Sequence, residues 1–212
     1  MQKFLSLLGV IWISMLSLSL AADPKVKFMP GEKELLDQVR QLKSKAQFRM
    51  ASAEELAAMN KAIEELWSRK YTGLSKEQKY SRLLMIAQGN ATENVSGEVQ
   101  VGAAAYLAVM EDPAVVPYLE KGTSVESPDG VSLECYRGIG RHLRGEGMMK
   151  IVKMLESPVA KESNYAFHMI NAFHRKEQLE ELRKCRDKMA ESKWKVFVSD
   201  MIAQMSRSIL AD

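Results

Sequence analysis

The sequence is poor in the residues that identify a disulfide-stabilised domain or a metalloenzyme. It has two cysteines, Cys135 and Cys185, and three histidines in 212 residues. Two cysteines form at most one disulfide, although these two could pair in an oxidising compartment. Both also fall among predicted helix-core positions, where cysteine acts as a small apolar residue. The sequence leaves a disulfide and two buried thiols open as alternatives.

An excess of charge of one sign is also absent. The formal net charge is +3, from 30 basic and 27 acidic residues. Proteins that bind nucleic acid usually concentrate positive charge, and this composition does not. We therefore expect no nucleic-acid partner.

Only one long apolar run is present, and it lies at the N-terminus. It extends from Phe4 to Leu20 behind Lys3, and Ser19-Leu20-Ala21 supplies small residues at the −3 and −1 positions of a cleavage site. This pattern predicts a signal peptide over residues 1–21. An uncleaved anchor is the alternative, but a run of about 17 residues with serines falls short of the roughly 20 that a bilayer needs. No cysteine adjoins the cut, so we expect an exported, periplasmic or extracellular protein without a lipid anchor or a membrane span.

Motifs for catalysis or cofactor binding are missing. His168 and His174 are six residues apart, on different faces of a helix, and no HExxH or i,i+4 histidine pair occurs. The glycine-rich stretch from Tyr136 to Gly147 fits neither GxGxxG nor the P-loop. In it, Gly138 and Gly140 indicate close helix contacts, and Gly145 indicates a helix end. We expect no metal site and no cofactor.

Apolar residues recur at helical spacing through most of the chain, and no segment is typical of a strand. Ser52 with Glu55 and Ser75 with Gln78 form two capping boxes in the first half. In the second half Asp112, Ser127 and Ser157 are expected to cap helices, and the last helix is expected to start after Ser192. The helices predicted there are Val101–Met110, Pro113–Glu120, Pro128–Leu143, Gly147–Glu156, Pro158–Phe173, Lys176–Met189 and Lys193–Ile209.

These second-half helices carry a repeat. Tyr106, Tyr136, Phe167 and Phe197 follow one another at intervals of 30, 31 and 30 residues. A second row, with intervals of 30, 31 and 31 residues, consists of Val109, Ile139, Ile170 and Met201. Such a period in a helical chain predicts stacked helix hairpins, each covering the apolar face of the next. An ordinary helix bundle is the competing interpretation.

The stretch from Val101 to Leu119 resembles a HEAT repeat of the subtype named after the phycobilisome lyases. Ala103-Ala104, Leu107-Ala108, Asp112-Pro113 and Val116-Pro117 stand at the characteristic positions. The later units agree in period and apolar pattern only. The resemblance implies an all-α, right-handed stack of antiparallel helix pairs, with about nine or ten helices after the signal peptide. It also implies a concave groove in which the second helices of the pairs face a protein partner. The subtype includes bilin-attaching lyases, but most proteins with such repeats are not enzymes, and a fold alone fixes no activity.

We divide the chain at a polar loop into the signal peptide (1–21), an N-terminal helical segment or cap (22–96) and the repeats (97–212). Charge alternates along the repeats: residues 100–136 carry −5, and residues 137–161 carry +4. This alternation indicates either contact between neighbouring units or a bipolar surface that orients a partner. The candidate contacts with a partner, near repeat edges, are Arg137, Arg141, Arg144 and Arg175.

The function expected from the sequence is an exported, non-enzymatic module that binds a protein or peptide in a solenoid groove. Replacing Arg137 and Arg141 by Glu should then lower affinity at low salt. One alternative is a hydrolase or lyase acting on an envelope polymer or an attached chromophore, which requires a carboxylate beside His142 or His168. The other is a structural subunit of an envelope assembly. It predicts an exposed apolar patch on the helix that carries Met201, Met205 and Ile209, although that spacing is also typical of a core.

Overall fold

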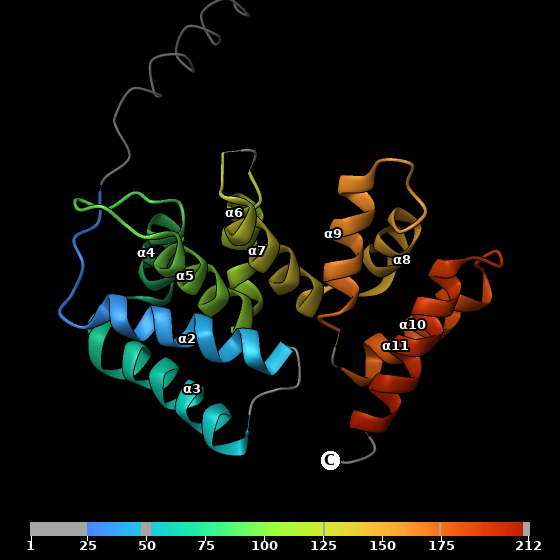
Figure 1. The fold of residues 1–212 in the computed structure, drawn as a ribbon, viewed down its shortest axis with the longest axis horizontal. Coiled ribbons are helices and arrows are strands. Elements are labelled where there is room, and N and C mark those ends of the chain that lie inside the picture. The colour runs from blue at the N-terminus through green and yellow to red at the C-terminus, as the bar shows by residue number, and fades with distance from the viewer. Residues whose placement is uncertain (1–24, 48–51, 125, 174, 210–212) are drawn as a thin grey trace, which may run out of the picture.

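The computed structural model of the chain describes residues 25–47, 52–124, 126–173 and 175–209. The predicted signal peptide, His174 and the side chain of Ile209 lie outside this description. Within it the fold is all-α, as predicted, with ten α-helices, no strand, and one isolated bridge between Val26 and Ala91 (Figure 1). The helices are α2 (Glu32–Gln47), α3 (Ala53–Glu65), α4 (Lys76–Ala87), α5 (Gly97–Val109), α6 (Val116–Gly122), α7 (Asp129–His142), α8 (Gly145–Met154), α9 (Ala160–Ile170), α10 (Lys176–Asp187) and α11 (Lys193–Ile209). A π-helical turn (Leu66–Lys70) extends α3, and a 3₁₀ turn (Pro113–Val115) precedes α6.

Local sequence signals place several helix starts. Both predicted capping boxes form: the Ser52 hydroxyl accepts the backbone N–H of Glu55, and the Ser75 hydroxyl accepts that of Gln78. Asp112 caps the turn before α6 by accepting the backbone N–H of Ala114 at 3.0 Å. These short-range bonds satisfy N–H groups that a helix start leaves unpaired.

Three other predicted helix ends are wrong. Ser127 and Ser157 do not cap α7 and α9, because each helix starts later than predicted. The Ser127 hydroxyl instead pairs with that of Ser124, and the Ser157 hydroxyl accepts the N–H of Val159 in the turn before α9. Gly145, expected to end a helix, is the first residue of α8, with a φ of +51° that favours glycine.

Two apolar clusters form the interior. The first unites α2, α3, α4, α5 and α6 with the first half of α7, and the second unites α8 to α11. Ile139, on α7, packs against both clusters, so α7 links the two parts of the core. In Figure 1, α2 crosses in front of α5, and α10 and α11 lie at the opposite end of the molecule.

Small residues allow the central helices to touch. A Cβ on Gly102 would lie 2.1 Å from the backbone oxygen of Leu36, so α5 meets α2 backbone to backbone. A Cβ on Gly138 would lie 2.8 Å from the Cα of Ala108, and one on Gly140 would lie 2.3 Å from the Met169 oxygen. The predicted close contacts at these glycines are therefore confirmed, and α5, α7 and α9 pack in succession.

The aromatic row that defines the repeat is divided between the clusters. Tyr106 is fully buried in the first cluster, whereas Tyr136, Phe167 and Phe197 pack against the second. The Phe167 and Phe197 rings are 4.9 Å apart. The last three members of the row therefore share one environment.

Candidate functional site

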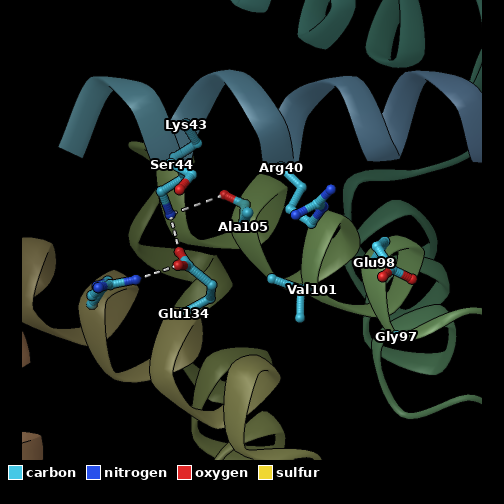
Figure 2. Close-up of a pocket in the computed structure, with 9 residues that line it drawn as sticks. Arg40, Lys43, Ser44, Gly97, Glu98, Val101, Ala105 and Glu134 are labelled. Atoms are coloured by element: carbon cyan, nitrogen blue, oxygen red, sulfur yellow. Dashed lines mark hydrogen bonds and ion pairs between the residues drawn. The ribbon is translucent and has the colours of Figure 1, made fainter. Parts of the chain in front are cut away.

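A polar pocket of about 320 Å³ opens between α2, α5 and α7. It lies where Gly102 brings α2 and α5 together, so the adjoining side chains of α2 reach across α5 toward α7. Figure 2 shows Lys43, beside Ser44 on α2, reaching toward Glu134. Glu98 lies on the other side of the pocket, with Arg40 and Val101 between it and Lys43. The residues that line it are Arg40, Lys43, Ser44, Gly97, Glu98, Val101, Ala105, Glu134 and Arg137.

The floor of the pocket is a buried ion pair. The Lys43 ammonium donates to Glu134 Oε2 at 2.5 Å and to the backbone oxygen of Ala105 at 3.4 Å. The two side chains are 11% and 9% exposed. Burial lowers the pKa of Lys43, and the Glu134 charge opposes this effect without cancelling it. Lys43 and Glu134 therefore hold each other in place, in a setting where an unpaired charge would be costly.

Arg137 shares the same carboxylate. Its Nη1 donates to the second oxygen of Glu134, and its Nη2 lies 3.5 Å from Nδ1 of His168, on α9. Burial alone would raise the pKa of Glu134, but the charges of Lys43 and Arg137 outweigh it, and the pKa is lowered. The pKa of His168 is lowered by burial and by the Arg137 charge.

A second polar cluster joins the C-terminal ends of α5 and α7 to the start of α10. Arg141 and Arg175 each donate to Glu111 at 2.5 Å, one to each carboxylate oxygen. The buried amide of Gln178 donates to the carbonyl oxygens of Gly140, Arg141 and Leu143, which lie at the end of α7. This cluster supplies hydrogen bonds to helix-end carbonyls and holds the two parts of the core together.

The four arginines expected to contact a partner fall into three settings. Arg137 lines the pocket, whereas Arg141 and Arg175 converge on Glu111 in the second cluster. Arg144 is exposed and donates to the carbonyl of Leu143. The structure therefore does not bring the four arginines together at one site.

His142 and His168 do not meet the requirement set for the hydrolase or lyase alternative. His142 Nε2 lies 3.0 Å from the carbonyl oxygen of Met110, and His168 faces Arg137. Among the described residues neither imidazole hydrogen-bonds a carboxylate. Burial is also the first cause of the lowered pKa of His142.

The sequence left open whether the two cysteines pair and whether the last helix carries an exposed apolar patch. Cys135 and Cys185 are free and buried, in different apolar clusters, and burial raises the pKa of Cys135 to about 12. Met201 and Met205, on α11, are buried in the second cluster, so these two form core rather than an exposed patch.

The part of the chain that the structure describes holds no group of three or more His, Cys, Asp or Glu side chains arranged to bind a metal. None of its helices combines the length and apolar character needed to cross a bilayer.

Lys43 and Glu134, at the centre of the pocket, were not predicted from the sequence. A signal for each was present. Lys43 continues the apolar face of Leu36 and Val39 at helical spacing, and Glu134 follows Val131 by three residues on a buried face. A charged residue at a core position of a helix indicates a buried partner, although it does not identify that partner.

Fold and pocket define the chain as an all-helical protein with a polar pocket, and comparison with known proteins adds no family. The chain matches no protein-family model, no curated protein and no solved structure.

Proposed function

We propose that the chain is an exported, non-enzymatic interaction module that holds a protein or peptide in a groove over α2, α5 and α7. The observation that carries this proposal is the pocket, in which a buried Lys43–Glu134 pair lies beneath an exposed rim. Hydrogen-bonded charges in a rigid setting give a partner orientation and specificity. Arg40, Ser44 and Glu98 are the accessible groups of this rim.

We further propose that the helices form a right-handed, HEAT-like stack. The succession of α5, α7 and α9 supports this arrangement, as do the two residue rows with a period near 31 residues. α5 and α7 are the first helices of successive pairs, so the groove proposed here lies over first helices, whereas the resemblance assigns a partner to the second helices. The predicted signal peptide is the reason to place this function outside the cytoplasm.

The proposed role of each residue in partner binding depends on how exposed its side chain is. Arg137 contributes from the pocket wall, Arg40 and Ser44 contribute from the rim, and Arg144 is available beside the α7–α8 turn. Arg141 and Arg175 act mainly through Glu111, which they hold between them. The affinity of a variant with Arg137 and Arg141 exchanged for Glu is therefore a poor test of partner binding, because a carboxylate at position 137 would face the buried Glu134.

Site-specific photocross-linking is a sharper test. A photoreactive amino acid replaces Ser44, on the pocket rim, and the protein is expressed in its native cell and irradiated. We expect a discrete protein adduct, and we expect Arg40→Glu to reduce its yield because the charge of the rim is reversed. The affinity of the isolated partner should then fall as salt concentration rises.

The matched control places the same amino acid at Ala203, an exposed small residue on α11. Adducts that are identical from Ser44 and Ala203, or that are insensitive to Arg40→Glu, contradict the proposal. Circular dichroism of each variant checks that the helices remain folded.

A further inference from the structure

The charges at the floor of the pocket do not balance. Lys43 and Arg137 share the single carboxylate of Glu134, and each takes one of its two oxygens. The exposed fractions of the three side chains are 11%, 19% and 9%. His168, on the far side of Arg137, adds no negative charge. In this cluster two basic side chains thus face one carboxylate in a setting that is largely shielded from water, where a positive charge attracts an anion, while the Arg40 charge is offset by Asp37.

Hydrogen-bond donors are in excess as well. The Lys43 ammonium has three N–H groups and donates to two acceptors. The Arg40 guanidinium donates through Nε to Asp37 at 3.0 Å, and its two Nη groups have no acceptor among the described residues. A ligand with acceptor oxygens and a negative charge would satisfy these donors.

Other lining residues restrict the ligand to a single negative charge. Glu98 lies at the rim, where it would repel a second anionic group. Val101 and Ala105 supply apolar wall next to Arg40 and Lys43, which suits a short aliphatic stem (Figure 2). A planar carboxylate also matches the forked geometry of a guanidinium.

We propose that this pocket binds one carboxylate carried on a short aliphatic stem, between Arg40 on one side and Lys43 and Arg137 on the other. The carboxylate belongs to an acidic side chain or the C-terminus of a peptide, or to a small free acid. This inference rests on the proposed function because it assigns chemistry to the same pocket.

The test is titration of the purified, isotopically labelled protein, followed by NMR chemical shifts at low salt. Sodium propionate probes a free acid, N-acetyl-Ala-Glu-Ala-amide probes an acidic side chain, and N-acetyl-Ala-Ala-Ala probes a C-terminal carboxylate. N-acetyl-Ala-Gln-Ala-amide is the uncharged control. We expect saturable shifts around the pocket for at least one carboxylate probe and none for the control, and the strongest binder identifies the source.

Variants decide whether the pocket cations are responsible. Arg40→Gln and Arg137→Gln should each weaken binding about tenfold, which corresponds to about 1.4 kcal/mol. Arg183→Gln is the matched control, because Arg183 on α10 pairs with Glu180 three residues earlier, as Arg40 pairs with Asp37. Binding should be unchanged in that variant.

The inference is overturned if no carboxylate probe gives saturable shifts at the pocket, if the uncharged peptide binds equally well, or if all three variants weaken binding alike. Its failure is distinguishable from failure of the proposed function. An adduct from Ser44 without carboxylate binding removes this inference alone, whereas carboxylate binding without a protein adduct removes the protein-partner proposal.

Discussion

Lys43 and Glu134 illustrate how single side chains can depart from the pattern of the helices that carry them. Each occupies a position that helical spacing assigns to the core, and each is stable there because the other is present. Two cations share this carboxylate, so the members of the cluster are not equivalent. Removal of the carboxylate leaves two buried positive charges, whereas removal of Lys43 still leaves Arg137 to pair with Glu134.

We therefore predict that Glu134→Gln lowers the free energy of unfolding by about 3 kcal/mol, the cost of leaving buried charge without a partner. Lys43→Met keeps most of the side-chain volume and should cost only about 1 kcal/mol. Urea denaturation at neutral pH measures both values. A Lys43→Met variant that is as unstable as Glu134→Gln would contradict this account of the charge balance.

His168 makes stability depend on pH. Its folded-state pKa is lowered from 6.5, by burial first and by Arg137 second, while Glu134 opposes the shift. The unfolded chain then binds this proton more readily, so His168 costs stability as pH falls below about 6.5. We predict that His168→Gln loses less stability than the unmodified protein between about pH 7.5 and about pH 5.5.

The measurement is the free energy of unfolding at several pH values, with the two proteins compared at each. At the upper end of the pH range both proteins carry a neutral side chain at position 168. The difference between their free energies of unfolding at that pH is therefore the baseline. Parallel curves for the two proteins would show that His168 does not titrate with folding.

Among the helices, the spacing between α2 and α5 depends on Gly102. Its missing Cβ allows the backbone of α5 to approach the Leu36 carbonyl oxygen, and this contact sets how far α2 side chains reach across α5. The pocket is therefore a consequence of a close helix contact, not of a loop.

We predict that Gly102→Ala lowers the free energy of unfolding by about 2 kcal/mol or more, because the added methyl group meets backbone that cannot rotate away. Gly97→Ala is the matched control on the same helix, since a Cβ there has nothing within 4 Å. It should leave stability within about 0.5 kcal/mol or raise it slightly. Thermal and urea denaturation report both. Because Ala favours a helix more than Gly does, a Gly102→Ala variant as stable as Gly97→Ala would show that the contact with α2 yields to the added methyl group without cost.

Over the whole molecule, two apolar clusters meet along α7, and polar groups reinforce the junction. Gln178, on α10, is fully buried and donates to three carbonyls at the end of α7. Glu111, with Arg141 and Arg175, adds ion pairs that span the same boundary. The second cluster is therefore held to the first along α7, and polar groups reinforce the end of that helix.

We predict that Gln178→Met costs about 2 kcal/mol, because the buried carbonyls lose a donor that an apolar side chain cannot replace. The loss should be uneven: amide hydrogen exchange should accelerate more in α10 and α11 than in α4 and α5. Hydrogen exchange followed by mass spectrometry measures the pattern. Uniform acceleration would instead show that the two clusters unfold as one unit.

Much of the fold was accessible from local patterns in the chain. Helical periodicity predicted an all-α protein, and Ser52, Ser75 and Asp112 cap the turns expected of them. Gly138 and Gly140 make the close contacts inferred from their small size. These features were predictable because each depends on a residue and a few neighbours, and the side-chain oxygen or the missing Cβ acts the same way wherever it occurs.

The candidate site could not be predicted in this way, because its contacts depend on how distant helices pack. Lys43 and Glu134 are 91 residues apart, and Arg175 reaches Glu111 across 64. Helical spacing indicates that a charged side chain faces inward, but the position of its partner follows from the distance and angle between helices. Packing at Gly102 brings α2 over α5, and that contact determines which charges meet, which arginines remain available and where the pocket opens.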